Sequence, residues 1–395
     1  MDRFRLAIFN TQPPHLYFGG VERRIIEVTK RHQKDVDITV YSGTKAGFRQ
    51  PAEVNGMRIV PCYSTDRLYP IDNWFFNRSL SKTAGIFDAD LYEAHNVSGY
   101  GFPNKLKNHQ LKKPLVHVVH GPLRDEYEQA LKNEHQTARN KLANYFMRYQ
   151  AGLEEKMAQK ARLIVAVSKY SMGRILESYD VDKSKVRVVP NGVDPEKFKP
   201  EDRELARRQF GLDNELCVLF VGSLIPRKGL QFLVKAAEKI VKQQPQTKFL
   251  IVGDGPLKNQ LQAAIAALNL SGNFKFIGNL KDKQLADVYN CADVFALPSI
   301  QEGQGIVLLE AEASAVPVVA FEVGGIGEAV RNGETGFLVK LGNTEEFADA
   351  IIRLLSDRAL HDKMGLDGRR FVMENYTWDI CAQRMLKVYH EALET

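Results

Sequence analysis

Short apolar runs rich in β-branched residues alternate along the chain with longer amphipathic stretches. In the first half the runs are RLAIF, DITVYS, MRIVP, DLYEAH, LVHVVHG, LIVAVS and VRVVPNG. In the second half they are CVLFVGS, FLIVGDG, FKFIG, DVFALPS and VPVVAF. Buried strands that alternate with helices predict parallel α/β sheets of the doubly wound type, one in each half. Several runs end in Gly, Ser or Asn, so we expect ligands at the carboxyl ends of the strands.

A proline-rich segment, PNGVDPEKFKP at residues 190–200, interrupts this pattern directly after a predicted strand. Such an interruption predicts a domain boundary. The stretch 377–393 has apolar residues at roughly helical spacing and follows the last helix of the second half. We expect it to cross back, giving a first domain of residues 1–190 plus 377–395 and a second of 195–376. The positions that carry its helical pattern are Ile380, Met385, Leu386, Tyr389 and Leu393.

The composition agrees with two ordinary globular domains and excludes several other classes. The chain has 395 residues, of which 44% are hydrophobic and 26% charged, so it is neither disordered nor collagen-like. Its four cysteines are far apart and form no CxxC pair, which predicts reduced thiols in a cytosolic protein. No apolar run approaches the roughly 18 residues that span a bilayer, and the first residues turn polar too early for a signal peptide. We expect a cytoplasmic protein.

Charge is unevenly distributed along the chain. Residues 1–190 carry 30 Lys and Arg against 20 Asp and Glu, whereas residues 191–395 carry 24 against 28, within a net charge of +6. A basic first half and an acidic second half predict that the two domains meet different partners. The excess is spread over one half without a stacking motif, so we expect no nucleic-acid partner.

Two features of the first half are candidates for ligand contact. Gly19 and Gly20 precede an amphipathic helix, where they favour either the close approach of an anion or sugar or a plain tight turn. In LVHVVHGP, His117 and His120 fall on opposite faces of a strand because their separation is odd. His120 ends the strand and takes the ligand-facing position, where it can donate or accept a hydrogen bond, while His117 is expected to be packed. A packed His120 is the alternative.

Two cations, Arg227 and Lys228, stand at the start of a helix in VGSLIPRKGL. Their charge opposes the helix dipole, a conflict that a bound diphosphate would resolve. The spacing is not that of a P-loop. Gly253, in the strand-end turn GDGP, is expected to form a wall for a nucleotide base, whereas the Asp254 side chain is expected to serve the turn.

The segment 298–320, PSIQEGQGIVLLEAEASAVPVVA, is the richest in candidate chemistry. We expect Glu302 in a glycine-rich loop and Glu310 in the second turn of a helix that starts near Gly305. The amides of residues 303–306 would then face an anion. As alternatives, Glu302 caps the helix and Glu310 lies on a solvated face, although an apolar stretch makes the latter less favourable.

These residues carry a family resemblance. The chain resembles the retaining nucleotide-sugar glycosyltransferases of the GT-B fold, in the family typified by sucrose synthases and bacterial mannosyl- and glucosyltransferases (family 4, glycosyl transferases group 1). The signature is E-x7-E, here Glu302 to Glu310, flanked by PS-x-x-EG and ASAVPVVAFEVGGIGE; PNGVD and the final YTW…VY agree. The resemblance implies α/β architecture with two doubly wound, Rossmann-like domains facing across a cleft, the first binding the acceptor and the second the donor.

The resemblance also implies roles for individual positions. Lys228 with Arg227 would bind the diphosphate, and Glu310 the ribose hydroxyls. Glu302 would contact the donor sugar, and His120 would contact the sugar from the first domain. Backbone at the diphosphate would come from Gly19, Gly20, Gly303, Gly305 and Ile306. Two departures stand out: Ser223 replaces a frequent Arg, and Gln304 replaces a usual aromatic residue.

By the same resemblance, the enzyme is a metal-independent, retaining hexosyltransferase without a cofactor. A UDP-sugar is the favoured donor and GDP-mannose the next, and the acceptor is a glycan or is lipid-linked. Three D-x-D matches are interpreted as turn residues, so we expect no metal site. A GT-B-fold nucleotide-sugar epimerase is the alternative enzyme, and a non-catalytic binding protein is the third hypothesis.

Helix 139–161 is a candidate for contact with a lipid-linked or anionic acceptor. Its apolar stripe has basic residues around it, and the favoured interpretation is a helix packed on its own sheet. Together with Trp74, Phe75 and Phe76, the basic helix leaves open a peripheral contact with an anionic membrane at its cytoplasmic face. The stripe consists of Leu142, Phe146, Tyr149, Leu153 and Met157.

Overall fold

The computed structural model describes residues 3–17, 19–65, 71–131 and 138–394. The chain divides into two compact units, Met1–Asn191 with Trp378–Thr395, and Gly192–Thr377. The boundaries expected from the sequence lie next to this division. Which unit binds the donor and which the acceptor stays a prediction.

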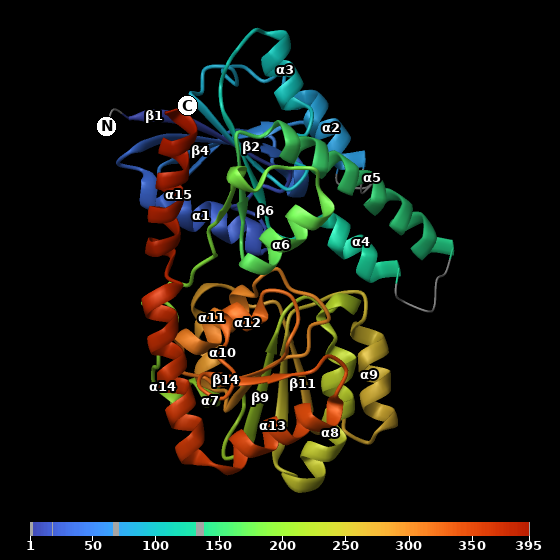
Figure 1. Ribbon diagram of the computed structural model, residues 1–395. Coiled ribbons are helices and arrows are strands. Elements are labelled where there is room, and N and C mark those ends of the chain that lie inside the picture. Colours follow the sequence, from blue (N-terminus) through green and yellow to red (C-terminus); the bar gives the residue numbers. More distant parts are fainter. Residues whose placement is uncertain (1–2, 18, 66–70, 132–137, 395) are drawn as a thin grey trace. The chain divides into compact units, whose positions relative to one another are not determined.

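The first unit is built on an eight-stranded sheet in the order β3-β4-β2-β1-β5-β6-β7-β8 (Figure 1). All neighbouring strands are parallel except β3, which runs antiparallel to β4 at the edge. The strands are β1 (Phe4–Asn10), β2 (Val36–Gly43), β3 (Ala52–Val54), β4 (Met57–Cys62), β5 (Leu91–His95), β6 (Leu115–Val119), β7 (Leu163–Ala166) and β8 (Val186–Val188).

Helices connect and cover these strands. They are α1 (Gly20–His32), η1 (Lys45–Gly47), α2 (Ile71–Leu80), α3 (Phe102–Asn108), α4 (Leu123–Leu131), α5 (Ala138–Lys160), α6 (Lys169–Ser178), η2 (Lys183–Lys185) and α15 (Trp378–Leu393), where η marks a short 3-10 helix. The core under α3 is aromatic, with the Phe9 and Phe102 rings edge to face at 4.8 Å. The sheet order reverses direction between β1 and β5, which is where doubly wound folds bind ligands.

The last helix, α15, lies alongside α1 and belongs to the first unit (Figure 1). The helix was expected from the sequence, but the face it buries is rotated from the expected stripe. Met385 and Tyr389 are buried as expected, whereas Ile380, Leu386 and Leu393 are only partly buried. The buried face is completed by Trp378, Cys381, Ala382, Val388 and Ala392.

The second unit is built on a six-stranded parallel sheet in the order β11-β10-β9-β12-β13-β14. The strands are β9 (Leu216–Val221), β10 (Thr247–Val252), β11 (Phe274–Gly278), β12 (Val294–Leu297), β13 (Val318–Phe321) and β14 (Gly336–Val339). The helices are α7 (Arg203–Gln209), η3 (Pro226–Lys228), α8 (Leu230–Gln243), α9 (Lys258–Ala267), α10 (Asp282–Asn290), α11 (Ile306–Ala313), α12 (Ile326–Ala329), α13 (Thr344–Ser356) and α14 (Arg358–Asn375).

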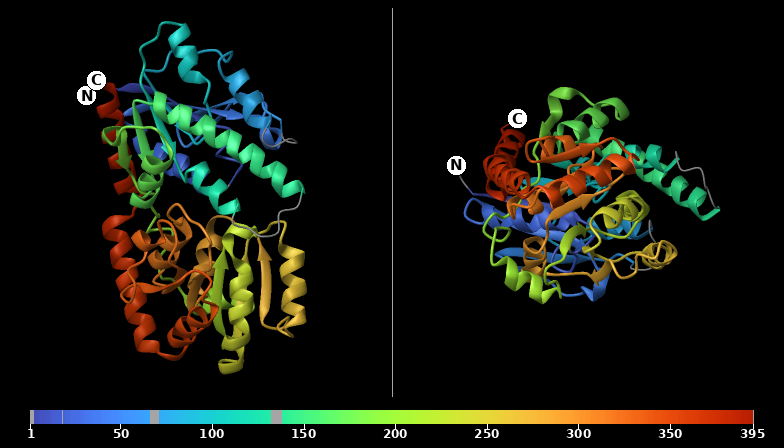
Figure 2. Two further views of the ribbon diagram at one scale, coloured as in Figure 1. Left: turned by 45° about the vertical axis from the view of Figure 1, so that its right-hand side comes forward. Right: turned by 90° about the horizontal axis from the view of Figure 1, so that it is seen from below.

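In the second unit α8 packs between α9 and α13 (Figures 1 and 2). The central strands β9, β10, β12 and β13 are buried on both faces, and one phenylalanine from each is completely inaccessible: Phe220, Phe249, Phe295 and Phe321. This sheet reverses its order between β9 and β12, which are neighbours in space although far apart along the chain. Ligands are therefore expected at the carboxyl ends of these two strands.

The expected packing of helix 139–161 is wrong for its first half. In α5, Met157 is completely buried, but Leu142 and Tyr149 are each 58% exposed. The helix contacts α4 and β6. The apolar stripe therefore continues beyond the surface against which the end of the helix packs.

Candidate functional site

The loops at the carboxyl edge of the second sheet pack backbone against backbone. A Cβ atom on Gly229 would lie 1.9 Å from the carbonyl oxygen of Pro298, and one on Gly253 would lie 2.0 Å from that of Gly222. A Cβ on Gly324 would likewise lie 1.9 Å from the carbonyl oxygen of Glu302. All three glycines have φ between 59° and 126°, so both the conformation and the close contact require glycine. The loops after β9, β10, β12 and β13 thus meet.

Hydrogen bonds fix these loops to one another. The amide of Ile300 donates to the Arg227 carbonyl at 2.8 Å, which joins the loop after β12 to the loop after β9. The Gly325 amide donates to the Glu302 carbonyl at 3.0 Å, which adds the loop after β13. The side chains on these loops are therefore held on a rigid frame.

Arg227, Lys228 and Glu302 meet at this edge. Lys228 Nζ forms an ion pair with Glu302 Oε1, and the Ser299 hydroxyl donates to the same oxygen at 2.9 Å. Arg227 Nη1 lies 3.7 Å from Glu302 Oε2 and donates to the Gln301 carbonyl at 3.1 Å. Both cations lie in η3, one turn before α8, which begins after Gly229.

The environment keeps Glu302 ionised. The residue is 6% exposed. Burial alone would raise its pKa, but the charges of Lys228 and Arg227, with hydrogen bonds from Lys228 and Ser299, hold the pKa below its ordinary value. The result is a buried carboxylate with two cations beside it, of which Arg227 is the more exposed.

Glu310 lies in α11 and is 1% exposed, so the solvated alternative is wrong. The Tyr289 hydroxyl, from α10, donates to Glu310 Oε2 at 2.7 Å. The helix begins after Gly305, which has φ of 90° and provides no side-chain cap. Glu302 thus belongs to the loop and Glu310 to the second turn, as expected. The backbone roles of Gly303, Gly305 and Ile306 stay predictions.

Gly253 directly follows β10 in a conformation that favours glycine, with φ of 126°. The neighbouring Asp254 side chain is exposed and accepts a hydrogen bond from the Gly255 amide at 2.8 Å. Asp254 therefore serves the turn, as the sequence predicts. A contact of Gly253 with a nucleotide base stays a prediction.

In the first unit, Gly19 is the N-cap of α1 and Gly20 its first residue, and both are exposed. A Cβ on Gly19 would lie 2.3 Å from Glu22 Oε2, and Glu22 Oε1 accepts from Asn10 Nδ2 at 3.0 Å. A carboxylate of the chain itself therefore already lies at this helix N-terminus, where the dipole stabilises negative charge. An anion that binds at Gly19 and Gly20 must approach beside Glu22.

His120 is half-buried and directly follows β6. Its Nε2 atom lies 2.8 Å from Nδ1 of His95, the last residue of β5. Burial, with the charges of His95, Arg24 and His117, keeps the pKa of His120 well below its ordinary value. His117 is completely buried, with Nε2 2.7 Å from the Asn96 carbonyl, as expected for the opposite face. His95 was not among the residues predicted from the sequence.

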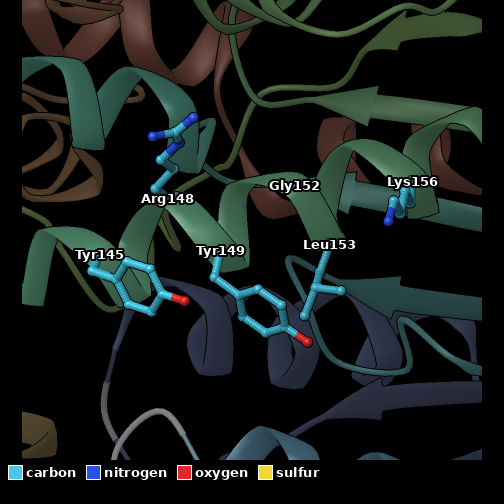
Figure 3. Close-up of a pocket in the computed structure, with 6 residues that line it drawn as sticks. All are labelled: Tyr145, Arg148, Tyr149, Gly152, Leu153 and Lys156. Atoms are coloured by element: carbon cyan, nitrogen blue, oxygen red, sulfur yellow. The ribbon is translucent and has the colours of Figure 1, made fainter.

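An apolar pocket of about 340 Å³ lies between α2, α5 and the loop after β5. Tyr149 and Leu153 also line a shallow depression of about 290 Å³ on α5, together with Arg148 and Lys156. In Figure 3, Tyr149 and Leu153 project from one side of α5 and Arg148 from the other. The larger pocket is lined chiefly by Ile71, Trp74, Tyr100, Phe146, Tyr149 and Leu153.

Neither a metal-binding cluster nor a membrane-spanning helix is found in the part of the chain that the structure describes. Within it, no group of three or more His, Cys, Asp or Glu side chains is placed to hold a metal ion. Among the same residues, no helix combines the length and apolar character that crossing a membrane requires.

The chain is similar to known proteins along most of its length. Residues 18–197 match the family model Glycosyltransferase Family 4, and residues 202–371 match Glycosyl transferases group 1. The D-inositol 3-phosphate glycosyltransferase of Nocardia farcinica is 36% identical over 249 residues, covering 61% of this chain and 55% of that protein. The chain thus spans little more than half the length of that curated relative.

A second curated relative comes from Corynebacterium glutamicum. It is the GDP-mannose-dependent monoacylated alpha-(1-6)-phosphatidylinositol monomannoside mannosyltransferase, 31% identical over 244 residues, or 59% of this chain and 63% of that protein. Among solved structures, the sucrose-phosphate synthase from Thermosynechococcus elongatus superposes with a TM-score of 0.85 at 22% identity, covering 99% of each chain. Both units carry a family match and the fold is GT-B, so the chain belongs to the glycosyltransferases of family 4, glycosyl transferases group 1.

Proposed function

We propose that the protein transfers a hexosyl unit from a nucleoside-diphosphate sugar to a glycan or lipid-linked acceptor, with retention of anomeric configuration and without a metal or cofactor. The observation that carries the proposal is the cluster of Lys228, Arg227 and Glu302 at the switch point of the second sheet. Two cations and an ionised carboxylate on a rigid frame suit a substrate that joins a diphosphate to a sugar. The two curated relatives, whose names state glycosyl transfer, support the reaction class.

Cleavage of the bond between the sugar carbon C1 and the diphosphate oxygen leaves negative charge on the diphosphate and positive charge on the sugar. Lys228 and Arg227 stabilise the first. Diphosphate binding draws Lys228 from Glu302, whose carboxylate then accepts a hydrogen bond from a sugar hydroxyl. The acceptor oxygen attacks C1 on the face from which the diphosphate departs, and the acceptor's proton passes to the diphosphate. Ser223 stands where the family frequently has an Arg, and Arg227 takes over the contact of that Arg with the diphosphate.

For the donor we favour a UDP-sugar over GDP-mannose, with Glu310 at the ribose and Gly253 beside the base. GDP-mannose is the second candidate donor, because the name of the Corynebacterium relative states that it depends on GDP-mannose. Gln304, which replaces the family's usual aromatic residue, is 3% exposed, and we expect it to affect sugar selectivity. His120, at the carboxyl edge of the first sheet, stays our candidate for contact with a sugar.

For the acceptor we favour a lipid-linked molecule held by the first unit. The apolar pocket between α2 and α5 supports this choice, because its predominantly apolar lining suits a hydrocarbon chain. The cations Arg148 and Lys156 on α5 suit an anionic group or a peripheral contact with an anionic membrane at its cytoplasmic face.

The test measures nucleotide binding and turnover in the intact protein. UDP should raise the melting temperature more than GDP, and Lys228→Gln should weaken UDP binding at least tenfold, since one charge-assisted contact contributes roughly 1.5–3 kcal/mol. Lys235→Gln, an exposed lysine of α8, is the matched control and should bind like the wild type.

Incubation with the donor alone separates the two enzyme classes. Slow hydrolysis supports a transferase, whereas an epimeric nucleotide sugar identifies the epimerase. Undiminished UDP binding by Lys228→Gln would overturn the proposed diphosphate site. Turnover that disappears in Glu302→Gln while UDP still binds would count against a non-catalytic binding protein.

A further inference from the structure

The first turn of α2 is tied to the carboxyl edge of the first sheet. Lys45, just after β2, forms an ion pair with Asp72, and their side chains are only 13% and 4% exposed. Asp72 Oδ1 also accepts a hydrogen bond from the Asn73 amide at 2.7 Å. The hydroxyl of Thr11, which directly follows β1, donates to Asn73 Oδ1 at 2.5 Å. Asn73 is therefore held in place by the loops after β1 and β2.

The hydrogen bonds of Thr11 determine which way the side-chain amide of Asn73 points. A separation of 2.5 Å is within the range of O–H···O bonds but too short for N–H···O, so the atom of Asn73 that contacts Thr11 is Oδ1. Thr11 Oγ1 also lies 3.0 Å from Ser98 Oγ, which accepts from the Thr11 amide at 3.0 Å. Because the one hydroxyl hydrogen of Thr11 goes to Asn73, the Ser98 hydroxyl donates to Thr11. Thr11 is 6% and Ser98 5% exposed, so this order of donors is set inside the protein.

The NH2 group of Asn73 is consequently turned away from Thr11. Asn73 lines the apolar pocket of about 340 Å³ between α2 and α5. Among the residues that the structure describes, none accepts a hydrogen bond from Asn73 Nδ2. The side chain has thus committed its acceptor to the protein, and its two N–H donors remain for a ligand in the pocket.

The position and the lining of the pocket indicate the class of ligand. Val97 follows β5 and Thr11 follows β1, so the end of the pocket at Asn73 lies where the first sheet reverses its order. Apart from Asn73 and Gln150, the lining is aliphatic or aromatic. A bare hydrocarbon would remove water from the Asn73 NH2 group without replacing its hydrogen bonds, which costs free energy. The pocket therefore suits a molecule that joins a hydrocarbon chain to an oxygen.

We infer that Asn73 determines specificity for the acceptor: its NH2 group donates a hydrogen bond to an oxygen of the acceptor's head group while the hydrocarbon chain lies in the pocket. The hydroxyls of Thr11 and Ser98 set the orientation of the amide that makes this contact. The identification of the ligand as the acceptor rests on the proposed glycosyl transfer, whereas the binding of an oxygen-bearing amphiphile does not.

Two probes with the same decyl chain test the inference in the intact protein. The head group of n-decyl β-D-maltoside carries oxygen acceptors, whereas that of decyltrimethylammonium carries no hydrogen-bond acceptor. Below their micellar concentrations both should bind in isothermal titration calorimetry, and free maltose should not. Asn73→Leu should weaken binding of the maltoside about fivefold, because its oxygen loses a hydrogen bond. The same variant should not weaken binding of decyltrimethylammonium, which also shows that the pocket is intact.

Asn73→Asp extends the test, because it keeps an oxygen for the Thr11 hydroxyl but replaces the NH2 donor by an acceptor. It should weaken binding of the maltoside and tighten binding of the ammonium cation. Asn108→Asp makes the same change at an exposed position of α3 and should bind both probes like the wild type.

Three results would contradict the inference: no binding of the maltoside by the wild type, unchanged maltoside binding in either Asn73 variant, or equal weakening of both probes by Asn73→Leu. The expected binding in a protein without transferase activity would contradict only the proposed function.

Discussion

The Glu154 carboxylate in α5 is completely inaccessible to solvent. Its Oε2 atom accepts from the Leu123 amide at 2.9 Å and from the Tyr179 hydroxyl. Burial raises the pKa of Glu154 to about 7, against an ordinary value of 4.5, although both hydrogen bonds oppose this shift. The group thus anchors the start of α4, three residues after His120, in a protonation state that changes near neutral pH.

The raised pKa of Glu154 predicts a pH dependence of stability. Between pH 4.5 and about 7 the folded protein retains a proton on Glu154 that the unfolded chain has lost. The stabilisation is therefore fully present below pH 4.5 and is lost as the pH rises through about 7. Glu154→Gln should remove this decrease in the free energy of unfolding, measured by urea denaturation across the window.

Glu155→Gln is the control for this prediction. Glu155 is the next residue of α5, and its side chain is 25% exposed. This variant should follow the pH dependence of the wild type. If Glu154→Gln does so as well, Glu154 does not determine the slope.

The sequence predicted individual residues of the candidate site better than their partners. Glu302 and Lys228 stood out because they follow strands and adjoin glycines. Their ion pair could not be predicted, because it depends on β9 and β12 being neighbours although about 75 residues separate them. His95, whose Nδ1 contacts His120, was missed although a signal was present: it is the last residue of the apolar run DLYEAH, at a strand end like that of His120.

Helix α5 is amphipathic but packs along only part of its length. Tyr145 is 67% and Tyr149 58% exposed, and Trp74 of the neighbouring α2 is 47% exposed. The Arg78 guanidinium lies over the Trp74 ring at 5.6 Å from its centre. Exposed aromatic residues mixed with cations are typical of interfacial contact with anionic lipid.

Arg148→Gln with Lys156→Gln should weaken binding to phosphatidylglycerol vesicles. Each cation near an anionic surface contributes about 1 kcal/mol, so loss of both should reduce the partition coefficient at least tenfold in a sedimentation assay. The matched control replaces Lys105 and Lys107, both exposed on α3, and should bind like the wild type. Equal binding by both double variants, or equal binding of the wild type to neutral vesicles, would exclude this surface as an electrostatic membrane contact.

Strands built from long β-branched runs were predicted correctly, but two short ones were not. β3 has only three residues, AEV, and pairs antiparallel at an edge, and β14 begins with Gly336. Neither has an apolar run long enough to differ from a loop. The helix 377–393 was expected, but its buried face was not, because the surface of α1 selects that face.

The two units have separate hydrophobic cores. Two methionines allow a matched comparison: Met385 in α15 belongs to the first unit and Met364 in α14 to the second, and each is 1% exposed. Met385→Ala should lower hydrogen-exchange protection in the first unit, and Met364→Ala in the second. Each change should cost about 2–5 kcal/mol of local stability. Equal loss of protection in both units from either variant would show that they unfold together.

The placement of α15 also constrains how the protein is made. A ribosome adds about 5–20 residues per second, and domains generally fold in the order in which they emerge. Here Trp378, Met385 and Tyr389, which fill the core of the first unit, are synthesised after every residue of the second. The second unit can finish folding while the first still lacks a helix. The surface of α1 in a nascent first unit therefore stays uncovered until α15 has been synthesised.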